Sequence, residues 1–190
     1  MKGGSQRGFS LLELLVALFV VMVITSLVTL SVNSGSQDAK LEAQVKSLAD
    51  RSAYALDEAQ MTGLDLGLLL EKTYASGDVV YRYSWLERGE KGWRAPEIDR
   101  DIFTAGEFDP EIELQLILED LPVPELAVRT DGLAVSPQVV FYASGETTPG
   151  FIELRQRDTG EILWLVEWDL LGRFSLLLRG EPLDSEFDDE

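Results

Sequence analysis

The side chains that could do chemistry here are carboxylates, because the 190-residue chain contains no histidine and no cysteine. Acidic residues gather in three places (Glu107, Asp109 and Glu111; Glu119 and Asp120; Asp184, Glu186, Asp188, Asp189 and Glu190). Oxygen ligands of this kind suit Ca²⁺, but neither the spacing nor the turn glycine of an EF-hand loop accompanies them. Runs of charge usually form solvated faces, so we predict no metal site and no cofactor.

The chain also lacks the partners that a nucleophile needs. A serine nucleophile requires a base, and no histidine is present to activate Ser144, which precedes Gly145. Catalysis by a serine–lysine pair requires a desolvated lysine, and we expect Lys72 and Lys91, the lysines of this region, to lie in turns. Histidine is also the commonest general base and metal ligand. The composition therefore argues against an enzyme.

The balance of charge limits the class of partner. The chain has 16 Lys and Arg against 34 Asp and Glu, a net charge of −18. Such a chain repels phosphate backbones, so we expect no nucleic-acid partner. Trp164 and Trp168 are four residues apart, which places them on one face of a strand. This spacing favours packing in the core over a platform for a sugar.

One carboxylate, Glu13, lies in unusual surroundings. Residues Leu14 to Val32 carry no charge. A helix from Leu11 to Val32 would be about 33 Å long and would match a hydrocarbon core of about 30 Å. Lys2 and Arg7 precede it, so the positive-inside rule places the N-terminus in the cytoplasm and the rest outside. Because a charge costs about 2.5–3.5 kcal/mol near the centre of a membrane helix, Glu13 needs a functional explanation.

Three interpretations of this segment compete. A secretory signal peptide has a shorter apolar core, of roughly 7–15 residues, with a small-residue cleavage site after it. A plain signal anchor fits the length but gives no reason for Glu13. The third interpretation rests on the residues Arg7-Gly8-Phe9-Ser10-Leu11-Leu12-Glu13. They resemble the processing site of type IV prepilins and type II secretion pseudopilins.

This resemblance gives each residue of the motif a role. In that family a prepilin peptidase cuts after the glycine, here Gly8, and methylates the new terminal residue, here Phe9. The family's assembly residue corresponds to Glu13. The cut would leave an ammonium group on Phe9, and in a low-dielectric bundle Glu13 would pair with the ammonium of a neighbouring subunit. We therefore expect a leader at residues 1–8, a transmembrane helix at 9–32, and topology set by Lys2 and Arg7.

Helical patterning resumes after the weak helix-forming stretch at residues 33–36. Residues spaced four and three apart form a stripe with many small side chains on one face (Leu41, Val45, Leu48, Ser52, Ala55 and Ala59). Gly63 is a good C-cap position. We therefore predict that residues 33–62 continue the helix as an amphipathic segment whose stripe packs closely against a sheet.

The remainder of the chain shows a strand period. Alternating residues and turn signals predict about seven strands (64–70, 79–83, 112–118, 138–143, 151–157, 161–168 and 173–178). Short links favour antiparallel pairing, with the first two strands as a hairpin. Residues 93–110 and 119–137 are less regular and are expected to be loops. The predicted fold is α+β: a long N-terminal helix packed on a β-sandwich-like domain at 63–180, followed by an acidic tail at 181–190.

The soluble part narrows the resemblance. The stretch from Pro137 to Pro149, with Ser144-Gly145 at its turn, is similar to a pattern near the C-terminal sheet of the general secretion pathway protein H family. Residues 59–63 and the closing Gly172-Arg173 are similar to that family as well. The resemblance implies a minor pseudopilin of the type II secretion system. Such a subunit belongs to the tip complex of a periplasmic pseudopilus that supports export of folded proteins across the outer membrane.

The same resemblance implies partners and a location. The partners are the prepilin peptidase, the other minor pseudopilins, the major pseudopilin, the inner-membrane assembly platform and, less directly, exoprotein cargo. The location is the bacterial inner membrane, crossed once, with the N-terminus cytoplasmic and the globular domain periplasmic. Two alternatives stay open: a FimT-like minor pilin of a type IV pilus, which shares the leader, and a membrane-anchored module that binds exoproteins.

Overall fold

A computed structural model describes residues 11–75, 77–97, 101–119, 121–123, 126 and 136–182, without the side chains of 26–36, 121 and 122. The chain divides into two compact units, residues 1–43 and 44–190. One helix, α1 (Leu11–Thr62), begins in the first unit and ends in the second. It continues through residues 33–36, so the weak helix-forming stretch does not end it.

The part of α1 in the second unit, residues 44–62, has one buried face. The predicted stripe is confirmed there: the five side chains are at most 1% exposed (Val45, Leu48, Ser52, Ala55 and Ala59). Asp50 and Asp57 are exposed. The helix ends as predicted at Gly63, whose φ of +72° suits glycine and whose N–H donates to Ala59 O at 2.9 Å.

The first sheet contains the predicted hairpin. β1 (Leu66–Ala75) pairs antiparallel with β2 (Asp78–Gly89) over the full length of β1, from Leu66 opposite Glu87 to Ala75 opposite Asp78. β3 (Gly92–Arg94) and β4 (Gly106–Glu107) both pair with β2, and β7 (Val139–Phe141) pairs with β1. The order is β3-β2-β1-β7, with β4 off this path.

The second sheet is built from later parts of the chain and is also antiparallel. It contains β5 (Ile112–Leu118), β6 (Leu121–Pro122), β8 (Gly150–Gln156), β9 (Ile162–Trp168), β10 (Phe174–Leu178) and β11 (Glu181–Pro182). The order is β11-β10-β9-β8-β5-β6. Each of the four long strands lies where the sequence predicts it, within two residues at either end.

The predicted number of strands is wrong. The described residues contain eleven strands rather than seven, and the additional ones are β3, β4, β6 and β11. Each has only two or three residues, too few to show an alternating pattern. The two segments predicted as loops therefore contain short strands, and the first also buries Phe103 and Phe108. The tail begins with β11, and residues 183–190 lie outside the described residues.

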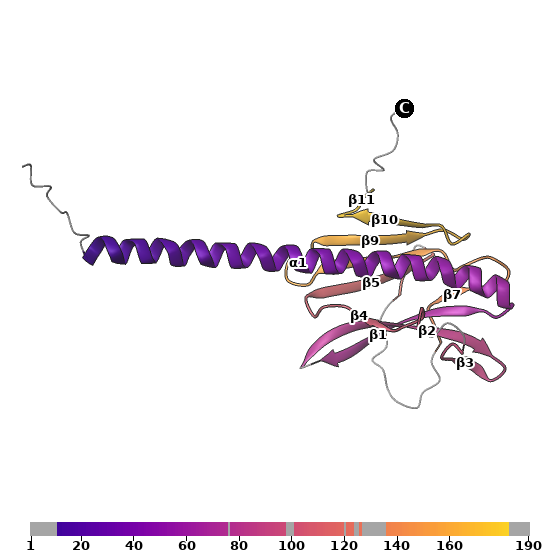
Figure 1. The fold of residues 1–190 in the computed structure, drawn as a ribbon. Helices are drawn as coiled ribbons and strands as arrows, with labels where there is room; N and C mark the ends of the chain where they lie inside the picture. The colour runs from indigo at the N-terminus through magenta and orange to yellow at the C-terminus, as the bar shows by residue number, and fades with distance from the viewer. Residues whose placement is uncertain are drawn as a thin grey trace, which may run out of the picture. The chain divides into compact units, whose positions relative to one another are not determined.

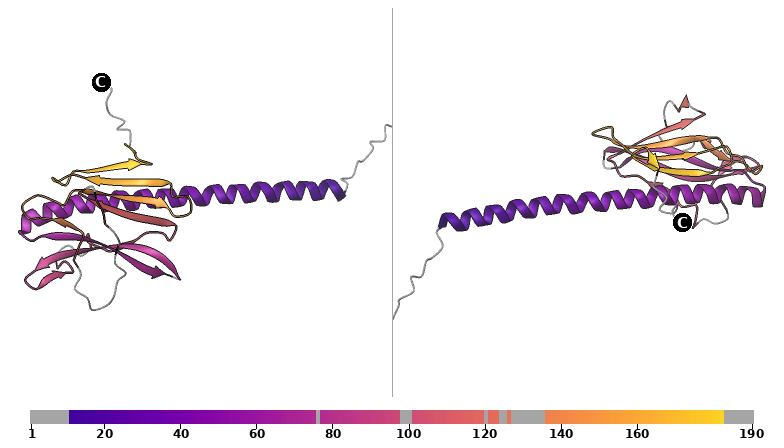
Figure 2. Two further views of the ribbon diagram at one scale, coloured as in Figure 1. Left: turned by 180° about the vertical axis from the view of Figure 1, so that it is seen from behind. Right: turned by 90° about the horizontal axis from the view of Figure 1, so that it is seen from above.

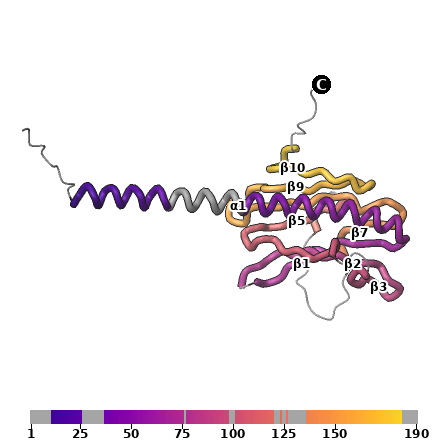
Figure 3. The backbone as a smooth tube through the Cα atoms, viewed as in Figure 1, coloured from indigo at the N-terminus to yellow at the C-terminus, as the bar shows by residue number. Residues whose placement is uncertain are grey.

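Residues 44–62 of α1 and the two sheets share one core. A small interior space is lined from all three layers, by Leu48 and Ser52, by Leu68, Val139 and Phe141, and by Ile152, Val166, Trp168 and Phe174. Figures 1 and 2 show this part of α1 beside both sheets, which lie on the same side of it. The backbone trace follows the same course in Figure 3. The architecture is α+β, as predicted.

Candidate functional site

The processing motif lies mostly outside the described residues. Lys2, Arg7, Gly8 and Phe9 belong to the first ten residues, whose placement is not described. Glu13 is the exception, and it lies exposed in the first turn of α1. Its carboxylate therefore stands at the N-terminal end of a helix, where the helix dipole favours negative charge.

The helix that follows Glu13 is apolar on every side. Its twelve large apolar side chains between Leu11 and Ile24 are 42–81% exposed. A helix that is hydrophobic all round is not stable facing water, so these side chains require an apolar environment. Over the residues whose placement is described, no helix reaches both the length and the apolar character that a membrane span needs.

Side chains of α1 hold a segment that the sequence analysis assigned to a loop. Gln44 donates to Glu107 O at 2.9 Å, and Arg51 donates to both Thr104 O and Thr104 Oγ1. Tyr54 packs against Phe103, with ring centroids 5.8 Å apart. These contacts join residues more than 45 positions apart, and no local pattern in the sequence signals them.

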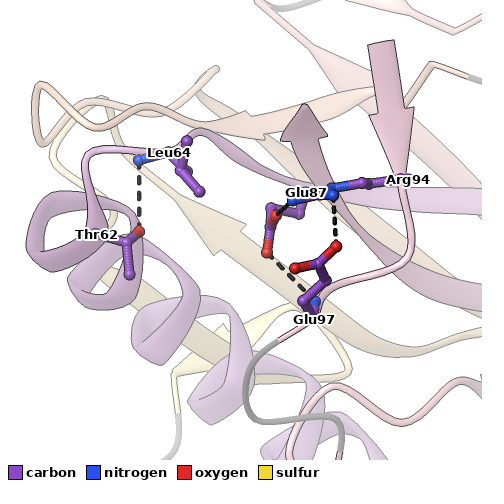
Figure 4. A network of polar contacts seen from close by, with 5 residues as sticks. All are labelled: Thr62, Leu64, Glu87, Arg94 and Glu97. Atoms are coloured by element: carbon purple, nitrogen blue, oxygen red, sulfur yellow. Dashed lines mark hydrogen bonds and ion pairs between the residues drawn. The ribbon is translucent and has the colours of Figure 1, made fainter. Parts of the chain in front are cut away.

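A carboxylate also anchors the β2–β3 hairpin (Figure 4). Glu87 is 5% exposed, and its Oε1 accepts from Arg94 at 2.7 Å. The main-chain N–H of Glu97 donates to Glu87 Oε2, and Arg94 also pairs with Glu97. The hydrogen bond to Glu87 raises the pKa of Arg94 above its ordinary value. Two carboxylates share the one guanidinium group of Arg94, and together these contacts tie the segment after β3 to β2.

In the acidic group considered for Ca²⁺, the carboxylate of Asp109 and the main-chain carbonyls of Glu107 and Glu111 accept hydrogen bonds within the fold. Asp109 Oδ1 accepts from the N–H of Glu111, and Glu111 O accepts from the N–H of Arg157. Glu107 O accepts from Gln44. Within the described part of the chain, no three carboxylates come together as a metal site would require. Asp120 and the acidic residues after 182 lie outside it.

The remaining candidates are structural as well. Trp164 and Trp168 share the inner face of β9 and are 4% and 3% exposed, so the prediction of core packing is confirmed. Ser144 lies exposed in a turn between β7 and β8. The prediction for Lys72 is wrong, because it lies within β1, opposite Tyr81, with Nζ 5.9 Å from the centre of that ring. The strand β1 continues to Ala75, further than the turn signals of the sequence indicated.

Comparisons with known families match both units of the chain. The family described as "Prokaryotic N-terminal methylation motif" matches residues 4–29. The family described as "Type II transport protein GspH" matches residues 44–172, which is more than half of the chain. The first match includes the motif around Gly8, and the second begins where the second compact unit begins.

Individual relatives agree with these matches. Type II secretion system protein H of Pseudomonas aeruginosa is 27% identical over 158 residues, covering 80% of this chain and 85% of that protein. The protein of the same name from Aeromonas hydrophila is 27% identical over 182 residues, 93% of this chain and 96% of that protein.

Solved structures share the fold. The minor pseudopilin EpsH from the type 2 secretion system of Vibrio cholerae superposes with a TM-score of 0.58 at 21% identity, covering 77% of this chain and 99% of that one. The solution structure of Escherichia coli GspH gives 0.52 at 18% identity, with 78% and 93% covered. The chain therefore belongs to the family described as Type II transport protein GspH.

Proposed function

We propose that this chain is a minor pseudopilin of a type II secretion system, in the tip complex that supports export of folded proteins across the outer membrane. The observation that carries the proposal is the order of parts: a prepilin-type motif, an apolar helix, and a body that matches the GspH family. The proteins of Pseudomonas and Aeromonas named above bear the corresponding name. The family is one of structural subunits and is not a known enzyme family.

In this proposal the N-terminal region is processed and stays in the inner membrane. The prepilin peptidase cuts between Gly8 and Phe9, and Phe9 is methylated. Residues 9–32 cross the membrane, Lys2 and Arg7 keep the leader in the cytoplasm, and the body lies in the periplasm. The match of residues 4–29 to the methylation motif supports this assignment.

Glu13 has the role of setting register in this assembly. It lies one helical turn after Phe9, so in an apolar bundle its carboxylate pairs with the ammonium group of a neighbour's first residue. Burying this carboxylate and ammonium group in a low-dielectric site costs free energy unless the two form an ion pair. Registers of neighbouring subunits that keep the two groups apart are therefore disfavoured. Other pseudopilins, the major subunit and the assembly platform are the partners that this contact implies.

Deletion of the chain from a cell that has both a type II secretion system and type IV pili tests the proposal. We expect secretion of type II exoproteins to stop and surface pili to remain. The opposite result would identify the chain as a minor pilin. Restoration of secretion by the full chain, but not by Glu13→Ala, would attribute the defect to assembly.

A further inference from the structure

The body exposes apolar side chains mainly at one end. Eight large apolar side chains are exposed among the described residues 44–182. Five of them belong to three segments: the end of α1, the turn after β7 and the turn between β9 and β10. We define these five as the helix-end patch: Met61 (82% exposed), Leu64 (40%), Tyr142 (39%), Leu170 (51%) and Leu171 (57%). Apolar side chains that gather in one patch of a protein surface often mark a binding site.

The three segments of the helix-end patch are in direct contact. Asp65, just past the end of α1, accepts a hydrogen bond from the N–H of Ala143 at 3.0 Å. The turn after β7 is joined to the β9–β10 turn, because the N–H of Thr147 donates to Leu170 O at 2.9 Å. A Cβ at Gly172 would collide with Leu56 of α1. Figures 1 and 2 show the end of α1, β7 and the β9–β10 turn at the same end of the body.

The backbone that carries the helix-end patch is fixed by hydrogen bonds. Asp169 Oδ1 accepts from the N–H groups of Leu171 and Arg173, which closes the turn that carries Leu170 and Leu171. The turn at Tyr142 is closed by its N–H, which donates to Glu146 O at 2.8 Å. The backbone of such turns is already ordered, so little further loop ordering is needed when a partner covers them. This geometry suits a lasting contact, because obligate interfaces are the more apolar class.

The surrounding charge indicates the chemistry of the partner. Residues 44–190 contain 13 basic against 31 acidic residues, so this unit carries the whole net charge of the chain. The three segments of the patch (residues 61–65, 142–147 and 169–173) contain Asp65, Glu146 and Asp169, of which Asp65 pairs with Arg88 of β2 and Asp169 with Arg173. Because the unit as a whole is strongly acidic, two copies that face each other through this end would repel, so a second copy is disfavoured. A surface with an apolar centre and a rim of lysine or arginine is complementary.

We propose that the helix-end patch docks a different subunit of the same assembly, through an apolar surface with a basic rim. The identity of the partner rests on the proposed function, whereas the patch itself rests on exposure and contacts in this chain. An exported protein is a less suitable occupant, because it must dissociate again and transient interfaces are more polar than lasting ones.

A photo-crosslinking amino acid at Leu171 of the full chain, in cells with the complete secretion system, tests the docking. The matched control carries it at Tyr74, which is 64% exposed at the far end of the β1–β2 hairpin. We expect Leu171 to link to another pseudopilin, identified by peptide mass, and Tyr74 to give at most about a tenth of that yield. No product at Leu171, equal yields, or a product with a second copy or an exported protein would overturn the proposal.

Charge substitutions test the basic rim. Two double variants replace the leucines of the β9–β10 turn: Leu170→Lys with Leu171→Lys, and Leu170→Glu with Leu171→Glu. Both remove apolar contact, and we expect each to reduce crosslinking from a probe at Met61 at least tenfold. The lysine pair should lose more, because it repels a basic rim. Equal losses would refute the stated chemistry, and Tyr74→Lys should change nothing. Unchanged thermal unfolding of the full-length variants would exclude misfolding. If deletion of the chain still stops secretion while the crosslinks fail, the patch proposal fails and the proposed function stands.

Discussion

The two parts of α1 make opposite demands on their surroundings, although one unbroken helix contains both. Between Leu11 and Ile24 the large apolar side chains are 42–81% exposed, and they lie on all sides. Between Gln44 and Thr62 one stripe of small and apolar side chains is buried, and acidic residues such as Asp50 and Asp57 face solvent. The rear part packs against other elements of the same chain, whereas the front part leaves its large apolar side chains exposed among the described residues. The helix is therefore specified by two different environments.

The largest effect is expected from changing Gly8, the last residue of the proposed leader in front of the helix. Gly8→Ala should leave the precursor uncut. The peptidase of the proposed pathway cuts directly after glycine, and the added methyl group would lie next to the bond that is cut. A gel or mass measurement of the chain would show a product longer by the eight leader residues. Gly63→Ala, at the end of the rear part, is the matched control.

Gly63→Ala should be cut normally and only lose about 1 kcal/mol of stability, since φ is +72° and nothing lies within 4 Å of an added Cβ. A normal mature product from Gly8→Ala would remove the basis for the prepilin assignment, whatever the body resembles.

Leucines in the two parts of α1 test the comparison directly. Leu48→Ala removes a side chain that is 1% exposed in the shared core, and it should lower the free energy of unfolding of the body by about 2–5 kcal/mol. Leu18→Ala removes one that is 60% exposed, and it should change that free energy by less than about 0.5 kcal/mol. Urea unfolding of the full chain in detergent, followed by tryptophan fluorescence, measures both.

Similar losses for the two variants would mean that the front part contributes to the fold of the body. Loss of secretion in Leu18→Ala with unchanged unfolding would instead agree with a role for the front part outside the body's own core.

The sequence predicts the elements that carry their own period. The rear stripe of α1, the β1–β2 hairpin and the four long strands of the second sheet were all found from spacing. The two-residue and three-residue strands were not, because a pattern needs more positions than they have. Alternation also fails in β1, where six consecutive residues from Leu66 to Glu71 are buried. Pro137 and Trp93 lie against Gly67 on the second face, from segments that the local pattern cannot place.

The candidate sites divide in the same way. The motif around Gly8 and Glu13 is readable in the sequence because its residues form one continuous segment. The helix-end patch is not, because Met61, Tyr142 and Leu170 come from three distant segments, and isolated apolar residues in turns carry no signal. Long-range contacts such as Arg51 with Thr104 were missed for the same reason.

A smaller effect on stability is expected at a buried hydroxyl group of the body, where hydrogen bonding can be tested. Thr147 is 1% exposed, and its hydroxyl finds no hydrogen-bond partner among the described residues. Thr147→Val keeps the shape and removes a buried polar atom, so it should leave stability unchanged or raise it by up to about 1 kcal/mol. Thr147→Ser keeps the hydroxyl and removes a methyl group, so it should cost about 1 kcal/mol. Clear destabilisation by Thr147→Val in urea unfolding would indicate a bonded hydroxyl.

The smallest effect is expected where the body depends on charge at its surface. Asp169 closes the turn of Leu170 and Leu171, and its pKa lies below the ordinary 3.8, chiefly because its carboxylate accepts a hydrogen bond from the Arg173 backbone and from the Arg173 side chain. A lowered folded pKa means that this stabilisation is complete above the unfolded value and is lost as pH falls through the folded value. The turn should therefore loosen only in acid, below 3.8, while the core stays folded.

The amide chemical shifts of Leu171 and Arg173, followed on acidification, would report this titration. Asp169→Asn keeps an oxygen acceptor for the two N–H groups but cannot titrate, so both shifts should lose their acid dependence. A transition at or above 3.8, or one that persists in Asp169→Asn, would assign the pH dependence to another group. The two carboxylates differ in where their cation comes from: Asp169 pairs with Arg173, four residues away, whereas Glu13, in the proposed assembly, receives an ammonium group from another subunit.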